Sequence, residues 1–367
     1  REFLKARIGL CVLHPLTGCE GRPCWVEHAD GLREASQFPS LISPHQPFLQ
    51  VAAISYEVHP GLMARVRVSG DVFETEDHPN WSDASFKTYS TPLSLPYPVR
   101  VGAGEHLEQA MELTLRGAAT PGSRGEGPVE IALDWEQRRA PGAIGAVWNP
   151  HFPVGFLSHL RVDLDLDAPG WRIRLREAAQ PGVPLELGAF TDQPELRFPA
   201  LDHELKRIQA KVARLLVFPA DGRVTRAEAC AVAREVLGGA AIIGGGSNAN
   251  FAELNRNRGI VNSLDVVSWT LNPQVHAVDE TTMIENLEGQ SPAVRTARTF
   301  SGTRPLSASP VLVPRFPASA AWLIASLKHL LEAGIDSVTY QTDEPVLNDI
   351  CRLAPTSIVP PRSSEPS

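Results

Sequence analysis

Short apolar runs alternate with amphipathic segments from residue 143 to residue 342, and this alternation limits which folds the chain can adopt. Repeated strand–helix units pair their strands in parallel, because each helix returns the chain to the same edge of the sheet. Eight such strands predict a closed (β/α)8 barrel of the TIM type, with an open doubly wound sheet as the alternative. The predicted strands span residues 143–148, 158–164, 184–190, 214–219, 240–244, 266–272, 309–314 and 337–342, and predicted helices span 201–212, 226–237 and 319–333.

The first part of the chain has a different pattern of apolar and polar residues. Residues 63–73 and 108–115 alternate apolar and polar side chains with the period of two that a half-buried strand shows, and Pro, Gly and Ser clusters separate such runs. We therefore predict a β-sandwich domain over residues 1–138, the barrel over 139–352 and an irregular tail over 353–367. Because no helix follows the last predicted strand, we expect the barrel to be incomplete at its C-terminal end.

Bulk composition excludes several classes of protein. Hydrophobic residues make up 43% and charged residues 21%, as expected of a chain that folds around a core. The formal net charge of −8 argues against nucleic acid as a partner, since nucleic-acid-binding proteins present a basic face. No apolar run approaches the ~20 residues that cross a bilayer. The 5 cysteines are odd in number and unevenly spread, which favours the reducing cytoplasm over a disulfide framework, and the oligomeric state stays open.

Residues 242–258, IIGGGSNANFAELNRNR, raise the question of nucleotide binding. Gly244, Gly246 and Ala249 match the G-x-G-x-x-A spacing of a dinucleotide loop behind an apolar strand. That fingerprint also needs an acidic residue at the end of the next strand, which here ends in Asn272-Pro-Gln. No Gly-Lys-Ser/Thr follows to form a P-loop. The sequence therefore predicts no dinucleotide and requires no cofactor. We assign no metal site, and the sequence leaves open whether a divalent metal lies among Asp163, Glu186, Glu253 and His276.

The polar residues after these glycines predict a different binding site. Glycines at the carboxyl end of a barrel strand allow a sharp turn and the close approach of a ligand, and active sites lie at that end of the barrel. Asn248, Asn250, Glu253 and Arg256 offer hydrogen-bonding groups suited to a polyhydroxylated molecule. The alternative is that the asparagines only cap turns and a short helix.

Three other strand ends carry polar groups. The sixth predicted strand is followed by Asn272, Gln274 and His276. His276 is the predicted proton carrier, because imidazole titrates near neutral pH. Arg315 follows the seventh strand and offers a cation for a carboxylate or an oxyanion, and Glu344 follows the eighth.

Charged residues also occur inside two of the predicted barrel strands. Arg161 and Asp163 share one parity, and therefore one face, of the second strand, and Glu186 lies inside the third. Buried charges are costly unless they pair with each other or contact a ligand. The sequence leaves two interpretations open, namely a set of substrate-binding residues or an internal ion-pair network that fills the barrel.

Three blocks of the sequence resemble the D-apionate lactonase family of bacterial apiose breakdown. The first comprises RIGLCVLHP at 7–15 and ISPHQPF at 42–48, and the second is GDVFETEDHPNWSDASFKTY at 70–89. The third comprises residues 244–258 and NPQVHA at 272–277. The similarity runs over most of the chain, and family members are longer at both ends. The resemblance implies hydrolysis of a five-membered sugar lactone, D-apionolactone, to D-apionate, but it assigns no role to a residue.

The second block is dense in charge around Trp81, at the end of a predicted strand. Such a cluster either docks the sandwich domain on the barrel or closes over a substrate, and both interpretations stay open. The charged residues of this block that we single out are Glu74, Glu76, Asp77, Asp83 and Lys87.

We predict a sugar lactonase, a carboxylic-ester hydrolase that uses no serine nucleophile because no G-x-S-x-G motif occurs. His276 or Glu253 would activate water as a general base, and Arg256 or Arg315 would stabilise the developing oxyanion with help from asparagine side chains. The predicted substrate-binding residues are Asn248, Asn250, Arg256, Asn272, Gln274, Arg315, Arg161, Asp163, Glu186 and Glu344.

Two other functions stay open. A glycoside hydrolase on the same barrel would use Glu253 with Glu344 or Asp221 as its carboxylate pair. A non-catalytic carbohydrate-binding protein would also fit the sandwich domain. In each case the expected partner is a small carbohydrate, here a sugar lactone, and neither nucleic acid nor a membrane is expected.

Overall fold

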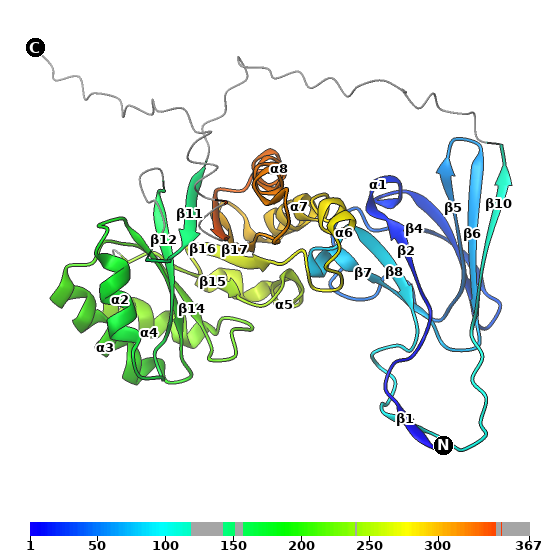
Figure 1. The fold of residues 1–367 in the computed structure, drawn as a ribbon, viewed down its shortest axis with the longest axis horizontal. Coiled ribbons are helices and arrows are strands. Elements are labelled where there is room, and N and C mark those ends of the chain that lie inside the picture. The colour runs from blue at the N-terminus through cyan, green and yellow to red at the C-terminus, as the bar shows by residue number, and fades with distance from the viewer. Residues whose placement is uncertain (119–141, 151–156, 239–240, 343–345, 347–367) are drawn as a thin grey trace, which may run out of the picture.

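The computed structural model describes residues 1–118, 142–150, 157–238, 241–342 and 346. Figure 1 shows a domain of antiparallel sheets at the N-terminal end and a parallel barrel after it. None of the helices in these residues is long and apolar enough to span a membrane. The predicted domain boundary at residue 138 and the predicted tail from residue 353 lie outside the described residues.

Two antiparallel sheets of the N-terminal domain share one hydrophobic core. The larger sheet has the strand order β10-β6-β5-β3-β4 and the smaller one the order β2-β8-β7. Val26, Ile54 and Val66 of the larger sheet pack with Phe86 of the smaller one. Each sheet thus buries one face, as predicted for a sandwich. The elements are β1 (Phe3–Lys5), β2 (Cys11–Pro15), α1 (Leu16–Cys19), β3 (Pro23–His28), β4 (Arg33–Gln37), β5 (Val51–His59), β6 (Leu62–Ser69), β7 (Glu74–Asp77), η1 (His78–Trp81), β8 (Ser85–Tyr89), β9 (Val99–Val101) and β10 (Ala110–Gly117).

Eight parallel strands close into a barrel, so the predicted fold class is confirmed and the open-sheet alternative is wrong. The last strand pairs with the first and completes the ring. The barrel strands are β11 (Ala143–Val147), β12 (His159–Asp165), β13 (Leu185–Phe190), β14 (Val212–Phe218), β15 (Ile243–Ser247), β16 (Val266–Leu271), β17 (Leu306–Leu312) and β18 (Ser337–Gln341). The helices are α2 (Trp171–Ala179), α3 (Pro194–Ile208), α4 (Ala227–Leu237), α5 (Phe251–Arg256), η2 (Arg258–Ser263), α6 (Glu280–Glu285), α7 (Gln290–Ser301) and α8 (Ser319–Glu332).

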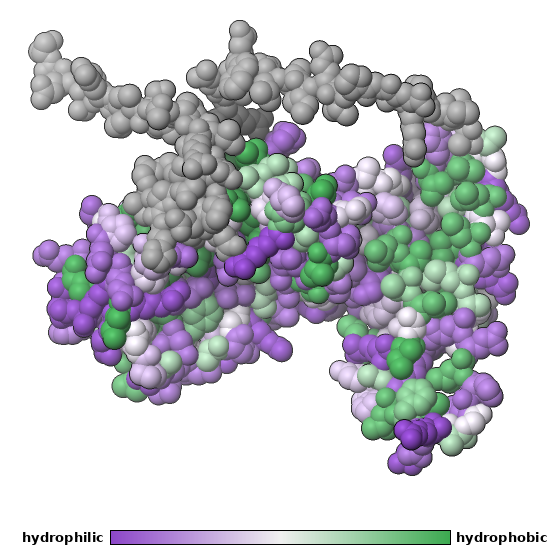
Figure 2. All heavy atoms as spheres, in the orientation of Figure 1, coloured by the Kyte–Doolittle hydropathy of each residue, from purple (hydrophilic) through white to green (hydrophobic). Residues whose placement is uncertain are grey.

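The outer helices bury one face and expose the other. In α2, Trp171, Leu175 and Ala178 are buried, whereas most of the residues between them are exposed. Figure 2 shows that the surface over α2 and α3 is mostly hydrophilic. The amphipathic pattern of the sequence therefore orients these helices against the barrel strands.

The glycine triplet does not end its strand as predicted but lies within β15. A Cβ atom on Gly246 would lie 2.2 Å from the carbonyl oxygen of Ser268, and one on Gly245 would lie 2.4 Å from Thr225 Oγ1. Both positions therefore need glycine so that neighbouring chain segments fit. These contacts give the two glycines a role in packing.

The segment that contains η1 docks the N-terminal domain on the barrel. η1 packs against α5 and α7. Asn255 Nδ2 on α5 donates to Asn80 Oδ1 at 3.0 Å, and the backbone N–H of Ala84 donates to Asn286 Oδ1 at 3.0 Å. These hydrogen bonds hold the end of β16 beside the end of β7. The residues that follow the two strands therefore lie close together.

Candidate active site

His276 and Asp83 come from different domains and form a hydrogen-bonded pair. His276 lies in the loop after β16, and Asp83 follows η1. His276 Nδ1 is 2.7 Å from Asp83 Oδ2, and Asn286 Nδ2 donates to Asp83 Oδ1 at 3.3 Å. Asp83 is 5% exposed, whereas the side chain of His276 is 35% exposed. A buried carboxylate on Nδ1 orients the imidazole and leaves Nε2 for proton transfer.

His78 stacks on His276 and restrains its ring. The two ring centroids are 4.4 Å apart and the ring planes meet at 22°. The ring of Trp81 meets His276 edge-on, with centroids 6.3 Å apart. His78 Nδ1 lies 3.1 Å from Ser85 Oγ. Burial lowers the pKa of His78 against the opposing effect of nearby carboxylates, so this imidazole is uncharged at neutral pH.

A cavity of about 380 Å³ opens beside His276 and is lined mostly by the N-terminal domain. Lys87 Nζ donates to Glu76 Oε1 at 3.1 Å on its wall, and the same ammonium lies 5.2 Å from the centroid of the Tyr89 ring. Arg7 lines the cavity and forms no hydrogen bond or ion pair with a described residue. The polar and aromatic residues of the wall are Arg7, Glu76, Trp81, Lys87, Tyr89, Ser90 and His276.

Glu76 is ionised although it is nearly buried. Burial favours its neutral form, but His78 and Lys87 together outweigh burial and hold the pKa of Glu76 below its usual value. His78 Nε2 lies 3.3 Å from Glu76 Oε1, the same oxygen that accepts from Lys87. The cavity wall therefore carries a carboxylate–ammonium pair.

His78, Asp83 and His276 also offer ligand atoms that lie within 4.8 Å of one another, as a metal site would require. A metal ion must lie in the ring plane of each histidine ligand, because the nitrogen lone pair lies in that plane. The two imidazole planes are stacked, so they do not meet at a point close to both rings. Asp83 also bonds His276 directly. This arrangement favours proton transfer over metal coordination.

Four of the residues that we predicted for substrate binding lie together inside the barrel. Arg161 is fully buried, and its Nε donates to Asp163 Oδ1 at 2.9 Å. Its Nη1 donates to Ser309 Oγ at 2.9 Å and its Nη2 donates to Asn248 Oδ1. The fourth, Glu186, joins them through Ser309. These side chains bond to one another, and the side chain of Asp163 stays 36% exposed.

Glu186 is the centre of this buried network. It accepts hydrogen bonds from Arg214, Ser309 and Thr339 and is 0% exposed. Burial alone would raise its pKa, but neighbouring positive charges, that of Arg214 first, lower the pKa to about 2. The contacts in the barrel interior are those of an internal ion-pair network, the second of the two interpretations that the sequence leaves open.

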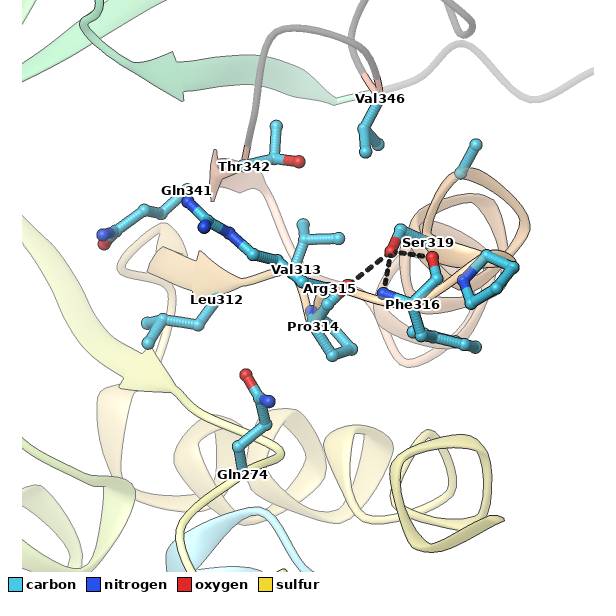
Figure 3. Close-up of a pocket in the computed structure, with 12 residues that line it drawn as sticks. Gln274, Leu312, Val313, Pro314, Arg315, Phe316, Ser319, Gln341, Thr342 and Val346 are labelled. Atoms are coloured by element: carbon cyan, nitrogen blue, oxygen red, sulfur yellow. Dashed lines mark hydrogen bonds between the residues drawn. The ribbon is translucent and has the colours of Figure 1, made fainter. Parts of the chain in front are cut away.

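Gln274 and Arg315 line a second cavity, of about 530 Å³, at the ends of β17 and β18. Figure 3 shows Gln274 pointing toward Leu312 and Pro314 from the loop below them, with Arg315 and Gln341 on the other side. Gln274 is only two residues from His276, yet these two side chains line different cavities. The predicted binding residues are therefore divided among separate places.

Arg256 and Asn272 contact the N-terminal domain. Arg256 Nε donates to the carbonyl oxygen of Pro44 at 2.9 Å, and its guanidinium lies 5.4 Å from the centroid of the Trp81 ring. The backbone N–H of Asn272 donates to Ser82 Oγ at 3.3 Å. Both residues hold the two domains together next to the cavity beside His276.

Glu253 lies on α5, and Asn250 precedes that helix. Neither is among the residues that line the cavity beside His276. The structure thus places His276, but not Glu253, on the wall of this cavity. Asp221 lies exposed in a loop, and Glu344 lies outside the described residues.

Sequence reasoning missed the partner of His276. It named Asp83 only as one charge of the 70–89 block, and 193 positions separate Asp83 from His276. It did not single out Arg7 at all. A pairing over such a separation leaves no local pattern, so the density of charge in the block is the one signal that points to this site.

Comparisons with known proteins agree on one family. Residues 1–118 match the family model described as "D-apionate lactonase, N-terminal domain", and residues 155–318 match the model described as "D-apionate lactonase, TIM barrel domain". A curated relative, the D-apionate lactonase of Brucella anthropi, is 30% identical over 346 residues. That match covers 85% of this chain and 56% of the relative, so the chain spans about half the length of the curated protein.

Two solved structures are similar at a much lower level. An endo-1,4-beta-D-mannanase from Thermotoga petrophila RKU-1, with maltose and glycerol, is 10% identical with a TM-score of 0.35, covering 51% of this chain and 80% of that one. A Schiff-base-forming fructose-1,6-bisphosphate aldolase is 10% identical with a TM-score of 0.25, covering 58% and 94%. At these scores neither likeness supports a conclusion about fold or activity.

Proposed function

This chain belongs to the D-apionate lactonase family, and we propose that it hydrolyses a sugar lactone, D-apionolactone, to the open acid D-apionate. The observation that carries the proposal is the His276–Asp83 pair, joined at 2.7 Å on the wall of a cavity. Lactone opening needs a general base for water and a cation or donor for the developing oxyanion, and this cavity offers both. The family relationship supports the choice of a sugar lactone as substrate.

The proposed reaction uses one imidazole twice. His276 Nε2 takes a proton from water while the water oxygen attacks the lactone carbonyl carbon. Asp83 stabilises the imidazolium that forms, because its carboxylate holds the Nδ1 proton. The tetrahedral intermediate then breaks the bond between the former carbonyl carbon and the ring oxygen. His276 returns its proton to that oxygen, which leaves as a hydroxyl, and the new carboxylic acid ionises in water.

Arg7 is the proposed stabiliser of the oxyanion. It lines the same cavity as His276, and its guanidinium forms no hydrogen bond or ion pair with a described residue, so its donors are available. Arg256 and Arg315, the earlier candidates for this role, are not among the residues that line this cavity. The proposal therefore moves the oxyanion site from the barrel to the N-terminal domain.

The cavity itself favours a lactonase over a retaining glycosidase. A retaining glycosidase needs two carboxylates about 5 Å apart on either side of the bond that it cleaves. Glu76 is the one carboxylate among the residues that line this cavity, and it is paired with Lys87. An imidazole oriented by a buried carboxylate favours proton transfer over binding alone.

The direct test measures acid release from D-apionolactone at constant pH by the whole chain and two matched variants. We expect His276→Ala to lower kcat/KM about 100-fold or more, as the loss of a general base does. His203→Ala removes an exposed histidine on α3 and serves as the control. A wild-type rate no greater than that of buffer, or full activity in His276→Ala, would refute the proposal.

A further inference from the structure

We propose that Glu76 and Lys87 read two hydroxyl groups on adjacent ring carbons of the lactone, and so decide which lactones are substrates. This inference rests on the proposed function, since it concerns the specificity of the same cavity. It assigns to the carboxylate–ammonium pair on the cavity wall a role that is separate from proton transfer.

The two side chains are fixed opposite each other by the sheet. Glu76 on β7 and Lys87 on β8 are direct cross-strand partners in the antiparallel register. Their side chains meet at 3.1 Å between Lys87 Nζ and Glu76 Oε1, and both residues line the cavity beside His276. The pair is therefore a rigid feature of the wall, because β7 and β8 hold both backbones.

The pair also retains unused hydrogen-bonding capacity. Glu76 Oε2 accepts no hydrogen bond from a described residue. Lys87 Nζ has three N–H donors, and Glu76 is its one hydrogen-bond acceptor among the described residues. A nearly buried carboxylate is costly unless its lone pairs are used, so this arrangement is suited to a ligand that completes it.

Adjacent hydroxyl groups match this arrangement. Their oxygens on a five-membered ring are separated by about one hydrogen-bond length, which is also the separation of the ammonium and the carboxylate. One hydroxyl donates to Glu76 Oε2 while its neighbour accepts from Lys87 Nζ. Trp81 and Tyr89 line the same cavity and add apolar surface for the C–H groups of the sugar.

A purely structural role makes a different prediction. Oppositely charged cross-strand pairs stabilise sheets by a few tenths of a kcal/mol to about 1 kcal/mol wherever they occur. If Glu76 and Lys87 only stabilised the sheet, their loss would lower the activity on every lactone by the same factor. If they read hydroxyl groups, their loss would change the ratio of activities between lactones, because a site built to bind a hydroxyl rejects the analogue that lacks it.

The experiment compares kcat/KM for erythronolactone, which carries adjacent hydroxyls, with kcat/KM for γ-butyrolactone, which carries none. We expect the wild-type chain to prefer the dihydroxy lactone by about 1000-fold or more. Glu76→Gln and Lys87→Met should each reduce this preference at least tenfold. Glu27→Gln breaks the Glu27–Arg65 ion pair between β3 and β6, whose residues do not line the cavity, and should leave the preference at its wild-type value. An unchanged preference in both cavity variants would overturn the inference.

A second measurement needs no variant to fold. The cyclic diol 1,4-anhydroerythritol presents the same two hydroxyls on a ring that cannot be hydrolysed. It should inhibit γ-butyrolactone hydrolysis competitively, whereas 3-hydroxytetrahydrofuran, with one hydroxyl, should inhibit at least tenfold more weakly. Equal inhibition by the two compounds would overturn the inference.

Failure of the proposed function would be recognised separately. If the wild-type chain hydrolyses no lactone, calorimetric titration with 1,4-anhydroerythritol still tests the diol site. Binding that Glu76→Gln weakens at least tenfold would support the site without the activity. Absence of binding would overturn the inference as well.

Discussion

The barrel interior and the cavity beside His276 are built from the same residue types, yet they differ in how completely their polar groups are used. Inside the barrel, Glu186 accepts three side-chain hydrogen bonds and Arg161 donates three. Beside the cavity, His276 Nε2 and the guanidinium of Arg7 make no hydrogen bond with a described residue. Saturated polar clusters stabilise a fold, whereas unsaturated ones beside a cavity are available for a ligand.

The first prediction concerns the saturated cluster around Glu186 inside the barrel. Glu186→Ala leaves Arg214 and Arg161 without their buried counter-charge, and removal of one partner from a buried ion pair costs about 3–5 kcal/mol. We expect the free energy of unfolding, measured by urea denaturation, to fall by about 4 kcal/mol. The matched change Glu235→Ala, on the exposed face of α4, should cost less than about 0.5 kcal/mol. A loss below about 1 kcal/mol for Glu186→Ala would contradict this account of the network.

The same carboxylate should contribute to the acid dependence of stability. The pKa of Glu186 is about 2 in the folded chain and about 4.5 in the unfolded chain, so the folded state favours the ionised carboxylate. Its contribution is therefore complete above pH 4.5 and is lost as the pH falls toward 2. The Glu186→Ala chain should show a shallower loss of stability over this window.

The second prediction concerns the unsaturated cluster around His276 beside the cavity. Asp83→Asn keeps the size of the side chain and its contact with Asn286, but it removes the charge that stabilises the His276 imidazolium. We expect kcat/KM for lactone hydrolysis to fall about 100-fold, equivalent to about 2.7 kcal/mol of transition-state stabilisation. Circular dichroism should show an unchanged fold. A loss of less than about tenfold would mean that Asp83 serves domain docking alone.

The fold could be predicted from the sequence because local patterns of residues determine it. Much of the barrel is built from short apolar runs that alternate with amphipathic helices, and that alternation is visible in the residues themselves. The beginning of β17 is an instructive exception. This strand starts at Leu306, earlier than predicted. The prediction missed its start because Ser307 and Ser309, which bond to arginines inside the barrel, interrupt the apolar pattern.

The candidate site could be predicted only in part, because it joins residues that are far apart in the sequence. His276 was identified as a titratable group at a strand end, where barrels carry their active sites. Its partner Asp83 lies in the other domain, and no periodicity or spacing links the two. Gln274 shows a different limit of sequence analysis: it lies two residues from His276, yet the two side chains line different cavities.

The third prediction tests whether the stacked ring of His78 helps His276. Removing the ring in His78→Ala leaves His276 free to rotate about its side-chain bonds, and we expect kcat to fall about tenfold. His78→Phe keeps a stacking ring and should lose less than about threefold. Rates for both variants are compared at the pH of maximal wild-type activity. If the phenylalanine variant is as slow as the alanine variant, then the nitrogen atoms of His78 matter and the stacking account is wrong.

The smallest effect concerns Asp77, a buried carboxylate of β7 whose pKa shifts in the direction opposite to that of Glu186. Asp77 is 2% exposed and, among the described residues, accepts one hydrogen bond, from the backbone N–H of Ser43 at 2.7 Å. Burial raises its pKa to about 8, against the opposing effect of that hydrogen bond. The folded chain therefore holds a proton that the unfolded chain loses near pH 4, and Asp77 costs stability increasingly as the pH rises from 4 to 8.

Asp77→Asn should remove this cost, since an amide oxygen still accepts from Ser43 and carries no charge. We expect the variant to be more stable than the wild type by about 1 kcal/mol at pH 8, with a Tm higher by about 2–4 °C. At pH 5 the difference should shrink, because Asp77 is then protonated in the folded chain. Calorimetry at both pH values decides the matter, and a variant that is less stable at pH 8 would show that the carboxylate is needed in its charged form. The sign of this effect is opposite to that of the acid loss expected from Glu186. The difference arises because several donors and positive charges surround the buried Glu186 carboxylate, whereas the buried Asp77 carboxylate accepts from Ser43 alone among the described residues.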